Sequence, residues 1–565
     1  EAVFMAASKS GAFHSAWPGS GQGTDQFSIP AQPRHLVSRG VTGSGVFAHS
    51  QPAGLPGLTL KTAVFLASTV GPVFASMLAG LGLSFAMLAL MRPALPVPWR
   101  WVWQGVTLHG GLWLVLHALL IVILGRPWFA MAIGLAFMML LIQVNNAKYH
   151  ALREAFVFQD FEYFTDAIWH PRLYIPFLGW WKFAMIVVAV LAAVSIGLWL
   201  EAAPENRFLL NGQLGDAAML LVAGIALLAI SGSGSDLTFQ PDTDMRRLGF
   251  LATLWRYGWA ERSPMNLPNL LPDMSSIAVS HGSENPDLLV IQSESFFDPR
   301  PLLAGIRPEV LAEFDRLNAE SICHGRLAVP AWGANTVRSE FAFLSGATEA
   351  MLGVHRFNPY RQVLKAEVLT LARVLKAAGY RTVCVHPYPA SFYGRDKVFP
   401  HLGFDEFIDI RSFEGAERFG PYISDRAVSE KVRVLMGLAD KPIFIFVITM
   451  ENHGPLHLEK PNAEDVRSLY SVAPPPGCDD LTVYLRHLRN ADRMIGELRC
   501  FLQQHPRSAR MCWYGDHVPI MADAYRQLGD PKGHTEYSLW SNRPAEKAAP
   551  ETIPLSALAG RLLGI

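Results

Sequence analysis

The sequence has few cysteines and no excess of charge of either sign. Its 565 residues include five cysteines, with 48 Lys plus Arg balanced by 48 Asp plus Glu. The cysteines show no CxxC pair and no zinc-ligand spacing, which excludes a dense disulfide framework but leaves one or two bridges open. They are Cys323, Cys384, Cys478, Cys500 and Cys512. Because the charge is balanced, we expect no nucleic-acid partner.

Charged residues are also scarce and unevenly spread. Only 17% of the residues are charged, 50% are hydrophobic, and the mean hydropathy is +0.21. A chain of this length exceeds one ordinary domain. Residues 1–58 are rich in Gly, Ser, Pro and Ala and have no hydrophobic periodicity, so we expect them to be disordered.

Long apolar runs follow this first segment. A helix needs about 20 mostly apolar residues to cross a bilayer, and five runs are of that kind. They cover residues 63–91, 104–125, 127–145, 177–199 and 216–233. Five such runs, almost without charge, disfavour the buried helices of a soluble core. The sequence therefore predicts a five-helix membrane domain over residues 59–234. For His109 and His117, in the second run, we expect packing or hydrogen bonds between helices.

Two connecting segments have the composition of a membrane surface. Residues 146–176 are aromatic and amphipathic, as suits the interface where Trp and Tyr gather. Residues 235–285 form a connector, and its stretch "MRRLGFLATLWRYGW" predicts a helix lying on the membrane.

From residue 286 the pattern alternates between strands and helices. "DLLVIQSE", "RTVCVHP", "PIFIFVITMENH" and "ARMCWYGDH" read as strands. "VLTLARVLKAAGY", "AVSEKVRVLMGLA" and "YLRHLRNADRMIGELRCFLQQ" read as helices. This alternation predicts an α/β domain over residues 286–565, with a largely parallel central sheet covered on both faces. Its active site should lie at the carboxyl ends of the strands.

Three predicted strands end in polar residues that can bind a metal ion. Glu294 ends the first, His453 follows another, and Asp516 and His517 end the last. Each alone is as readily a strand-end group facing solvent. Together, Glu294, Asp516 and His517 predict a site for one divalent cation, with Mn²⁺ favoured and Mg²⁺ or Zn²⁺ as alternatives.

Thr336 stands at a turn of small residues in "PAWGANTVRSEFAF". One interpretation is a helix N-cap, for which Thr is well suited. The other is a nucleophile, since a helix start favours an anion and a neighbouring cation would lower the pKa of the hydroxyl. A phosphoryl group would then find a nucleophile, a cation and oriented amides in one place.

Five motifs follow one another in the order "SESF", "GANTVRSEF", "HPYPASFYGRD", "ENHGP" and "YGDH". With these motifs the chain resembles the membrane phosphoglycerol transferases. This family includes the lipoteichoic acid synthases and belongs to the alkaline phosphatase and sulfatase superfamily. "SESF", "GANTVRSEF" and "YGDH" resemble its metal and nucleophile segments, which implies Glu294, Thr336, Asp516 and His517 as metal ligands and Thr336 as nucleophile. "HPYPASFYGRD" and "ENHGP" resemble its substrate segments, which implies that His386, Tyr393, Arg395 and His453 bind the headgroup.

The resemblance extends over residues 60 to 545 and implies a complete reaction. A multi-pass enzyme of the plasma or inner membrane would move glycerol phosphate from phosphatidylglycerol to a glycan or polyglycerol phosphate acceptor, through a covalent phosphothreonine-type intermediate. Its catalytic domain would lie on the periplasmic or extracellular side. Loop charges oppose this orientation under the positive-inside rule, because Lys148, Arg153 and Arg172 would be outside and Arg207 alone inside.

Other activities share the same fold and metal chemistry. A phosphoethanolamine transferase acting on a lipid or glycan is the nearest alternative, followed by a sulfatase-like phosphodiesterase. A true sulfatase needs Cys or Ser in a C/S-x-P-x-R motif, and no cysteine lies in one. The non-enzymatic alternative is a transporter or scaffold with an inactive domain, which the intact metal and nucleophile set disfavours.

Overall fold

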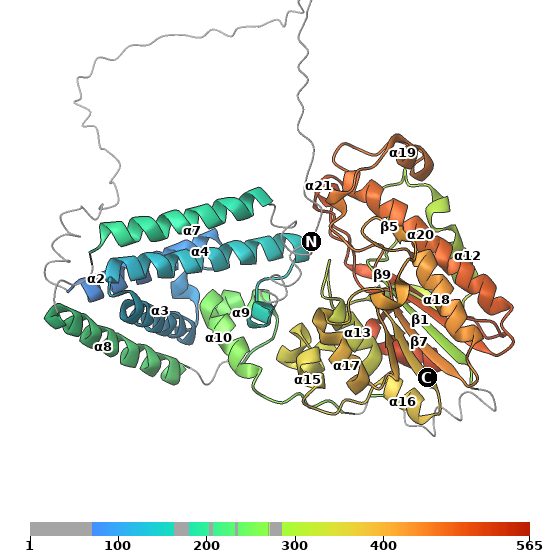
Figure 1. Ribbon diagram of the computed structural model, residues 1–565, viewed down its shortest axis with the longest axis horizontal. Coiled ribbons are helices and arrows are strands. Elements are labelled where there is room, and N and C mark those ends of the chain that lie inside the picture. The colour runs from blue at the N-terminus through green and yellow to red at the C-terminus, as the bar shows by residue number, and fades with distance from the viewer. Residues whose placement is uncertain are drawn as a thin grey trace, which may run out of the picture. The chain divides into compact units, whose positions relative to one another are not determined.

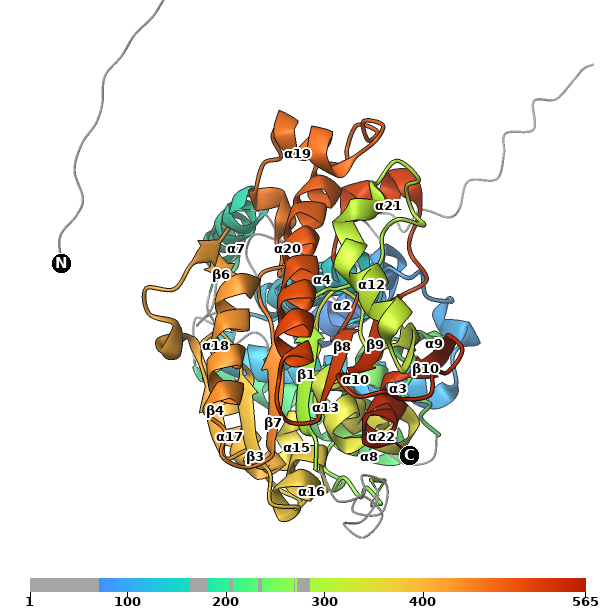
Figure 2. The same cartoon turned by 90° about the vertical axis from the view of Figure 1, so that its right-hand side faces the viewer.

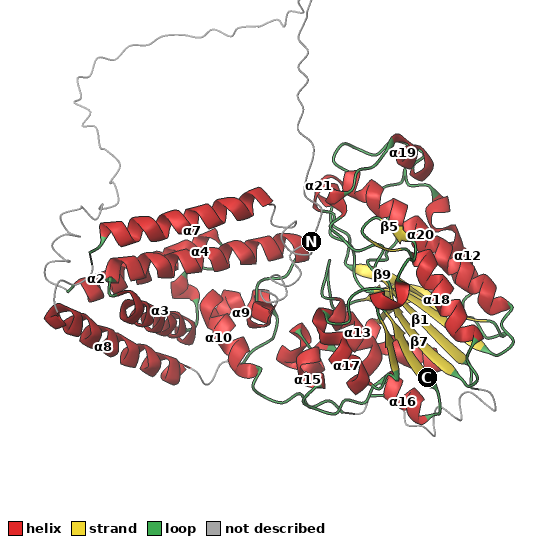
Figure 3. Cartoon of the chain, viewed as in Figure 1, coloured by secondary structure: helices red, strands yellow, loops and turns green. Residues whose placement is uncertain are grey.

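The computed structural model describes residues 71–162, 180–202, 207–231, 236–268, 270–271 and 285–564 (Figure 1). Within these ranges a helical region comes first and an α/β region follows, as Figure 3 shows by colour. The segment 1–58, predicted to be disordered, lies outside the described residues. So do residues 163–176 of the predicted interfacial loop, including Arg172.

Four helices of the described region are long and apolar enough to cross a membrane. They are Pro72–Leu90, Trp103–Leu124, Pro127–Leu152 and Leu210–Ser231, and they contain α2 (Pro72–Met87), α3 (Trp103–Leu124), α4 (Pro127–Leu152) and most of α8 (Arg207–Ser231). They confirm four of the five predicted runs. The run 177–199 coincides with α7 (Trp180–Leu200), of which Val190–Leu200 is a shorter apolar helix. The count of five spans therefore stays a prediction.

The two histidines of α3 link it to α2. Nε2 of His109 lies 2.9 Å from the hydroxyl of Ser84, and Nε2 of His117 lies 3.1 Å from the hydroxyl of Ser76. All four side chains are buried. Each contact satisfies polar groups inside an apolar helix pair, so the expected hydrogen bonds between helices are confirmed.

The connector forms two helices, which makes the prediction of one continuous helix wrong. α9 (Pro241–Leu248) and α10 (Phe250–Ala260) meet at Gly249, whose φ is +84°. A Cβ at this position would lie 2.3 Å from the ring of Trp101. Glycine therefore allows both the left-handed turn and the close approach of the ring. The periodicity of the sequence carries no signal of this long-range contact.

The α/β region contains one eight-stranded sheet. Its strand order is β10-β2-β9-β8-β1-β7-β3-β4. The bounds are β1 (Asp287–Ser293), β2 (Cys323–Ala328), β3 (Arg381–Val385), β4 (Glu406–Ile408), β7 (Ile443–Ile448), β8 (Ala509–Gly515), β9 (His534–Ser541) and β10 (Glu551–Pro554). β9 runs antiparallel to both its neighbours, and every other pairing in this sheet is parallel. The largely parallel sheet is confirmed, with β2, β4, β9 and β10 as additions that the patterns did not predict.

Alternate residues of the central strands face two separate cores. Leu289 and Ile291 of β1 face the core formed with α12, α18 and α20, while Leu288 and Val290 face the other helices. The helices on the first face are α12 (Ala312–Glu320), α18 (Asp425–Gly437) and α20 (Asp479–Gln503), and those on the second are α13 (Thr336–Ser345), α16 (Leu371–Ala377), α17 (Arg395–Leu402) and α22 (Leu555–Leu563) (Figure 2). Burial of both faces explains why these strands are almost uniformly apolar.

All five cysteines are free. Cys384 lies in β3 and Cys512 in β8, and two other strands separate them in the sheet. Cys500 is exposed on α20. The bridges that the sequence left open are therefore not formed.

Candidate active site

The edge where β1 and β8 end brings together three of the predicted metal ligands. Ser293 of β1 pairs with Gly515 of β8, so Glu294 and Asp516 leave two adjacent parallel strands at the same level. The ligand atoms of Glu294, Asp516 and His517 all lie within 4.8 Å of one another. All three side chains are buried. More than 200 residues of sequence separate Glu294 from the other two, and the strand register joins them.

Ser295 holds the two carboxylates in place. Its φ is 53°, a left-handed conformation that turns the chain sharply after β1. Its backbone N–H donates to Oδ1 of Asp516 at 2.8 Å, and its hydroxyl donates to Oε1 of Glu294 at 2.8 Å. Oδ2 of Asp516 is buried and has no hydrogen-bond partner among the described residues. Sequence reasoning missed Ser295, because nothing in "SESF" predicts a left-handed serine.

The imidazole of His517 presents a free nitrogen to the carboxylates. Its Nδ1 donates to the carbonyl of Val518 at 3.1 Å, so the lone pair is on Nε2. Nε2 lies 3.3 Å from Oδ2 of Asp516 and 3.6 Å from Oε1 of Glu294. Burial, and then the charge of Asp516, raises the pKa of Glu294 to about 8. The site thus offers two adjacent carboxylates, the unpartnered Oδ2 of Asp516 and the free Nε2 of His517, which together fit a divalent cation. These ligands suit Mn²⁺, Mg²⁺ and Zn²⁺ alike, so the identity of the metal stays open.

Thr336 is the first residue of α13, and hydrogen bonds join the start of this helix to the loop after β8. Asn335, with φ of 69°, occupies the N-cap position, so the N-cap interpretation of Thr336 is wrong. The hydroxyl of Ser339 donates to the carbonyl of Asp516 at 2.7 Å, and the backbone N–H of Gly333 donates to the carbonyl of Val518 at 3.0 Å. Thr336 lies one helical turn before Ser339, on the same side of α13.

Arg395 forms a buried ion pair with Glu340. It is the first residue of α17, and Glu340 lies on α13. The guanidinium donates from Nε to Oε2 at 3.2 Å and from Nη2 to Oε1, while the hydroxyl of Tyr360 also donates to Glu340. The guanidinium carbon lies 5.1 Å from the ring centroid of Tyr393. Both side chains are buried, so Glu340 anchors the arginine inside the protein.

His386 and His453 follow β3 and β7 at the same edge of the sheet. Nδ1 of His386 donates to the carbonyl of Ile448 at 3.1 Å, and Nδ1 of His453 to the carbonyl of Gly454 at 2.6 Å. Burial lowers the pKa of both, and the charge of Arg395 lowers them further. Both rings are therefore neutral near pH 7, with the lone pair on Nε2. Nε2 of His386 is buried without a partner among the described residues.

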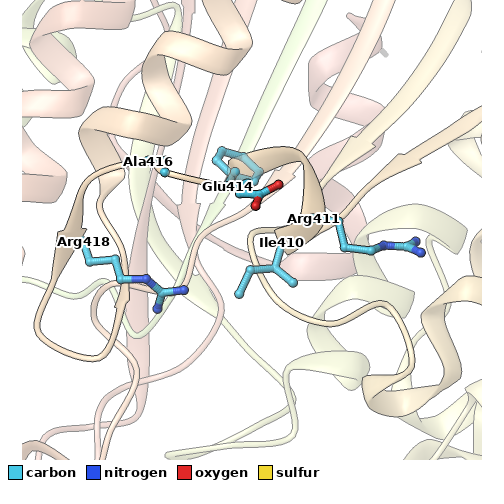
Figure 4. Close-up of a pocket in the computed structure, with 7 residues that line it drawn as sticks. Ile410, Arg411, Glu414, Ala416 and Arg418 are labelled. Atoms are coloured by element: carbon cyan, nitrogen blue, oxygen red, sulfur yellow. The ribbon is translucent and has the colours of Figure 1, made fainter.

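A separate hollow lies on the surface of the α/β region (Figure 4). It encloses about 450 Å³ and is lined by Ile410, Arg411, Phe413, Glu414, Gly415, Ala416 and Arg418. Arg411 pairs with Asp409 at 3.0 Å, and Arg418 donates to the carbonyl of Pro421 at 2.9 Å. None of the predicted site residues lines this hollow.

Comparisons with known proteins place the chain among similar sequences and folds. Residues 286–559 match the Sulfatase family model. The capsular polysaccharide biosynthesis protein RkpI of Rhizobium meliloti is 27% identical over 445 residues, covering 75% of this chain and 79% of that protein. Lipoteichoic acid synthase 1 of Bacillus subtilis is 29% identical over 185 residues, covering 29% of this chain and 26% of that protein.

One solved structure matches both the helical and the α/β parts. The integral membrane lipooligosaccharide phosphoethanolamine transferase A from Neisseria meningitidis is 12% identical, with a TM-score of 0.51 over 87% of this chain and 94% of that chain. It shows a shared fold. Together with the family model, these relatives confirm the superfamily that the motifs indicated. Residues 286–559, the α/β region of this chain, are therefore similar to the sulfatase family.

Proposed function

We propose that this chain is an integral membrane enzyme that transfers phosphoglycerol from phosphatidylglycerol to a glycan or polyglycerol phosphate acceptor. The observation that carries the proposal is the buried Glu294, Asp516 and His517 cluster at the sheet edge where α13 begins with Thr336. The sulfatase-family domain and the fold shared with a phosphoethanolamine transferase support a transferase of phosphorus-containing groups. The lipoteichoic acid synthase and capsular polysaccharide relatives support the donor and the acceptor respectively.

The residues of the site have distinct tasks in this reaction. A divalent cation bound by Glu294, Asp516, His517 and the hydroxyl of Thr336 would lower the pKa of that hydroxyl and offset charge on the phosphoryl oxygens. Thr336 Oγ1 forms a bond to phosphorus and gives up its proton, while the bond to the diacylglycerol oxygen breaks and that oxygen takes up a proton. An acceptor hydroxyl then attacks the same phosphorus, loses its proton, and returns Thr336 to its starting form.

The remaining residues fit a glycerol headgroup. Neutral His386 and His453 present Nε2 lone pairs, which accept hydrogen bonds from hydroxyl groups. A glycerol headgroup brings two hydroxyls to these two acceptors. Arg395 is held by Glu340 through Nε and Nη2, and its Nη1 donates to the carbonyl of Phe392 at 3.5 Å. One hydrogen on each Nη nitrogen is left to donate to a phosphate oxygen, and Tyr393 packs beside the guanidinium.

The orientation of the chain in the membrane is part of the proposal. Arg153, directly after α4, pairs with Asp530 at 2.8 Å, so the end of α4 and the α/β region lie on the same side. The five-span arrangement requires this too. Lys148 pairs with Glu154 and Asp160, both at 2.7 Å. Lys148 and Arg153, two of the positive charges that oppose an outside location, therefore both have acidic partners. A reporter fused after residue 565 that was active only in the cytoplasm would overturn this orientation.

The test uses the full-length protein in detergent micelles with Mn²⁺ and fluorescent phosphatidylglycerol. We expect labelled diacylglycerol from the wild type and none from Thr336→Ala. Thr348→Ala is the matched control, because Thr348 precedes α14 (Glu349–Leu352) at its N-cap position and makes no side-chain cap hydrogen bond. Equal release by wild type and Thr336→Ala would exclude Thr336 as the nucleophile.

A phosphoethanolamine transferase is the second candidate, favoured by the fold shared over 87% of this chain. The same assay with fluorescent phosphatidylethanolamine separates the two. Consumption of phosphatidylethanolamine but not phosphatidylglycerol would establish the second candidate and overturn the first.

A further inference from the structure

We propose that an apolar groove between α3, α4 and α10 holds one acyl chain of an anionic phospholipid, whose phosphate is bound by Arg262. The groove encloses about 320 Å³. Its walls include Leu112 and Leu116 of α3, Met138 and Leu141 of α4, and Leu254 and Trp259 of α10. It is separate from the Glu294, Asp516 and His517 cluster, and no predicted site residue lines it.

The chemistry of the lining favours a hydrocarbon chain. α3 and α4 are two of the helices long and apolar enough to span a membrane, so the medium around this groove is lipid rather than water. Phe137, Phe158 and Phe161 complete an apolar lining, and Arg262 alone among the lining residues is charged. An acyl chain fills such a groove without leaving a polar group unpaired.

Arg262 gives the groove a preference for a negatively charged headgroup. It is exposed, and its guanidinium carbon lies 4.2 Å from the ring centroid of Trp259. Among the residues that the structure describes, no ion pair includes Arg262, and the adjacent Glu261 pairs instead with Arg361 at 2.5 Å. Trp255 and Trp259 stack along α10 at 6.4 Å, as tryptophans do at the level of lipid headgroups. A lipid phosphate is the anion that both the apolar groove and this cation fit.

The groove is joined to the helix that carries Thr336. The ring of Tyr257, on α10, stacks on the ring of Phe357 with centroids 5.5 Å apart. The carbonyl of Phe357 accepts a hydrogen bond from Nε of Arg338 on α13 at 3.3 Å. A lipid that holds α10 in place therefore also supports the start of α13, although the lipid in this groove is not the reacting donor.

The test measures lipid binding without turnover, so its result does not depend on the proposed reaction. The full-length protein is placed in phosphatidylcholine nanodiscs with EDTA and trace lipid carrying a photoreactive acyl chain. One probe is phosphatidic acid, which has no glycerol headgroup to transfer, and the other is phosphatidylcholine with the same chains. Crosslinked residues are identified by mass spectrometry.

We expect phosphatidic acid to label the groove about fivefold more than phosphatidylcholine. Arg262→Gln should remove that preference, and Leu112→Trp or Leu116→Trp should abolish groove labelling by filling the space. Leu119→Trp on the exposed side of α3, and Arg100→Gln at the end of the short 3₁₀ helix before it, are matched controls that should change neither the preference nor the labelling. Gel filtration and melting temperature establish that each variant folds.

Two results would overturn the proposal. Labelling spread evenly over exposed positions such as Val122 and Ile123 would mean that the groove holds only bulk lipid. Equal labelling by the two probes, or an unchanged preference in Arg262→Gln, would exclude Arg262 as the phosphate contact. If the wild type shows the expected groove labelling but releases no diacylglycerol from phosphatidylglycerol, the result counts against the proposed function and not against the lipid groove.

Discussion

Arg338 donates two hydrogen bonds to Glu154, at 2.7 and 3.0 Å, across 184 residues of sequence. Arg338 lies two residues after Thr336 on α13, and its side chain is buried. Glu154 follows the end of α4 and also accepts from Lys148, which in turn pairs with Asp160. A network of four charges, of which Arg338 and Asp160 are buried and Lys148 and Glu154 half-buried, thus ties the helix that begins at Thr336 to the chain directly after a membrane helix.

Removing the charge of Glu154 should destabilise the protein and slow it. Glu154→Gln leaves Arg338 and Lys148 without a shared carboxylate, which costs about 3 kcal/mol for a buried pair. We also expect about tenfold lower activity, because α13 loses its support. Thermal unfolding and diacylglycerol release in detergent measure the two effects.

The neighbouring residue supplies the matched control for this change. Arg153 forms an exposed pair with Asp530, and such pairs contribute about 0–1 kcal/mol. Arg153→Gln should therefore leave both stability and rate nearly unchanged. Equal shifts in Glu154→Gln and Arg153→Gln would show that the network has no special role.

The same network should make the protein sensitive to acid. Burial by itself would raise the pKa of Glu154, but the charges of Arg338 and Lys148 hold it below the usual range. A carboxyl with a lowered folded pKa stabilises the native state above its unfolded pKa of about 4.3 and loses that contribution as the pH falls further. Melting temperature should drop below about pH 4.3 in the wild type. A drop of the same size in Glu154→Gln would contradict this origin.

Binding of a divalent cation should release a proton from Glu294. Burial and the charge of Asp516 raise the pKa of Glu294 to about 8, so without a cation this carboxyl is mostly protonated at pH 7. A cation needs the ionised form, and its affinity should rise with pH and level off above about 8. Calorimetry of Mn²⁺ binding in buffers of different ionisation enthalpy should find close to one proton released.

Two variants test whether Glu294 is the group that releases the proton. Glu294→Gln should bind Mn²⁺ weakly and release no proton, whereas Glu309→Gln, at an exposed position, should match the wild type. Proton release that persists in Glu294→Gln would assign it to another group.

The two histidines at the sheet edge should stay neutral into mildly acidic conditions. Burial and the charge of Arg395 lower the pKa of both His386 and His453. At saturating Mn²⁺, the acid limb of the kcat/KM profile should therefore lie below pH 6.5, the ordinary value for histidine. An acid limb at or above pH 6.5 would mean that one of them is charged in the working enzyme.

A pair of substitutions tests what His386 offers to the substrate. His386→Ala should lower kcat/KM by about 10²-fold, because the acceptor nitrogen is lost. His386→Gln retains an amide oxygen as an acceptor and should recover part of that loss. Equal loss in both variants would remove hydrogen-bond acceptance as its role.

The amino-acid sequence alone determined the order of the parts and most of the strands that carry the chemistry. The apolar runs predicted four candidate spans that the structure contains. The alternation of strand and helix patterns predicted β1, β3, β7 and β8, with polar residues at their ends. These features are local, since periodicity and run length depend on neighbouring residues. The sequence did not predict β2, β4, β9 and β10 or the break at Gly249, because strand pairing creates these strands and the ring of Trp101 accompanies the break.

The tertiary structure decided which polar residues meet. The register of Ser293 with Gly515 joins Glu294 to Asp516, and the left-handed Ser295 completes that corner. The partners of two buried arginines, Glu340 for Arg395 and Glu154 for Arg338, lie 55 and 184 residues away, and no local pattern indicates them. Buried charges need compensating charges wherever the fold provides them, so a single sequence shows the candidates for a site but not the pairs that hold it.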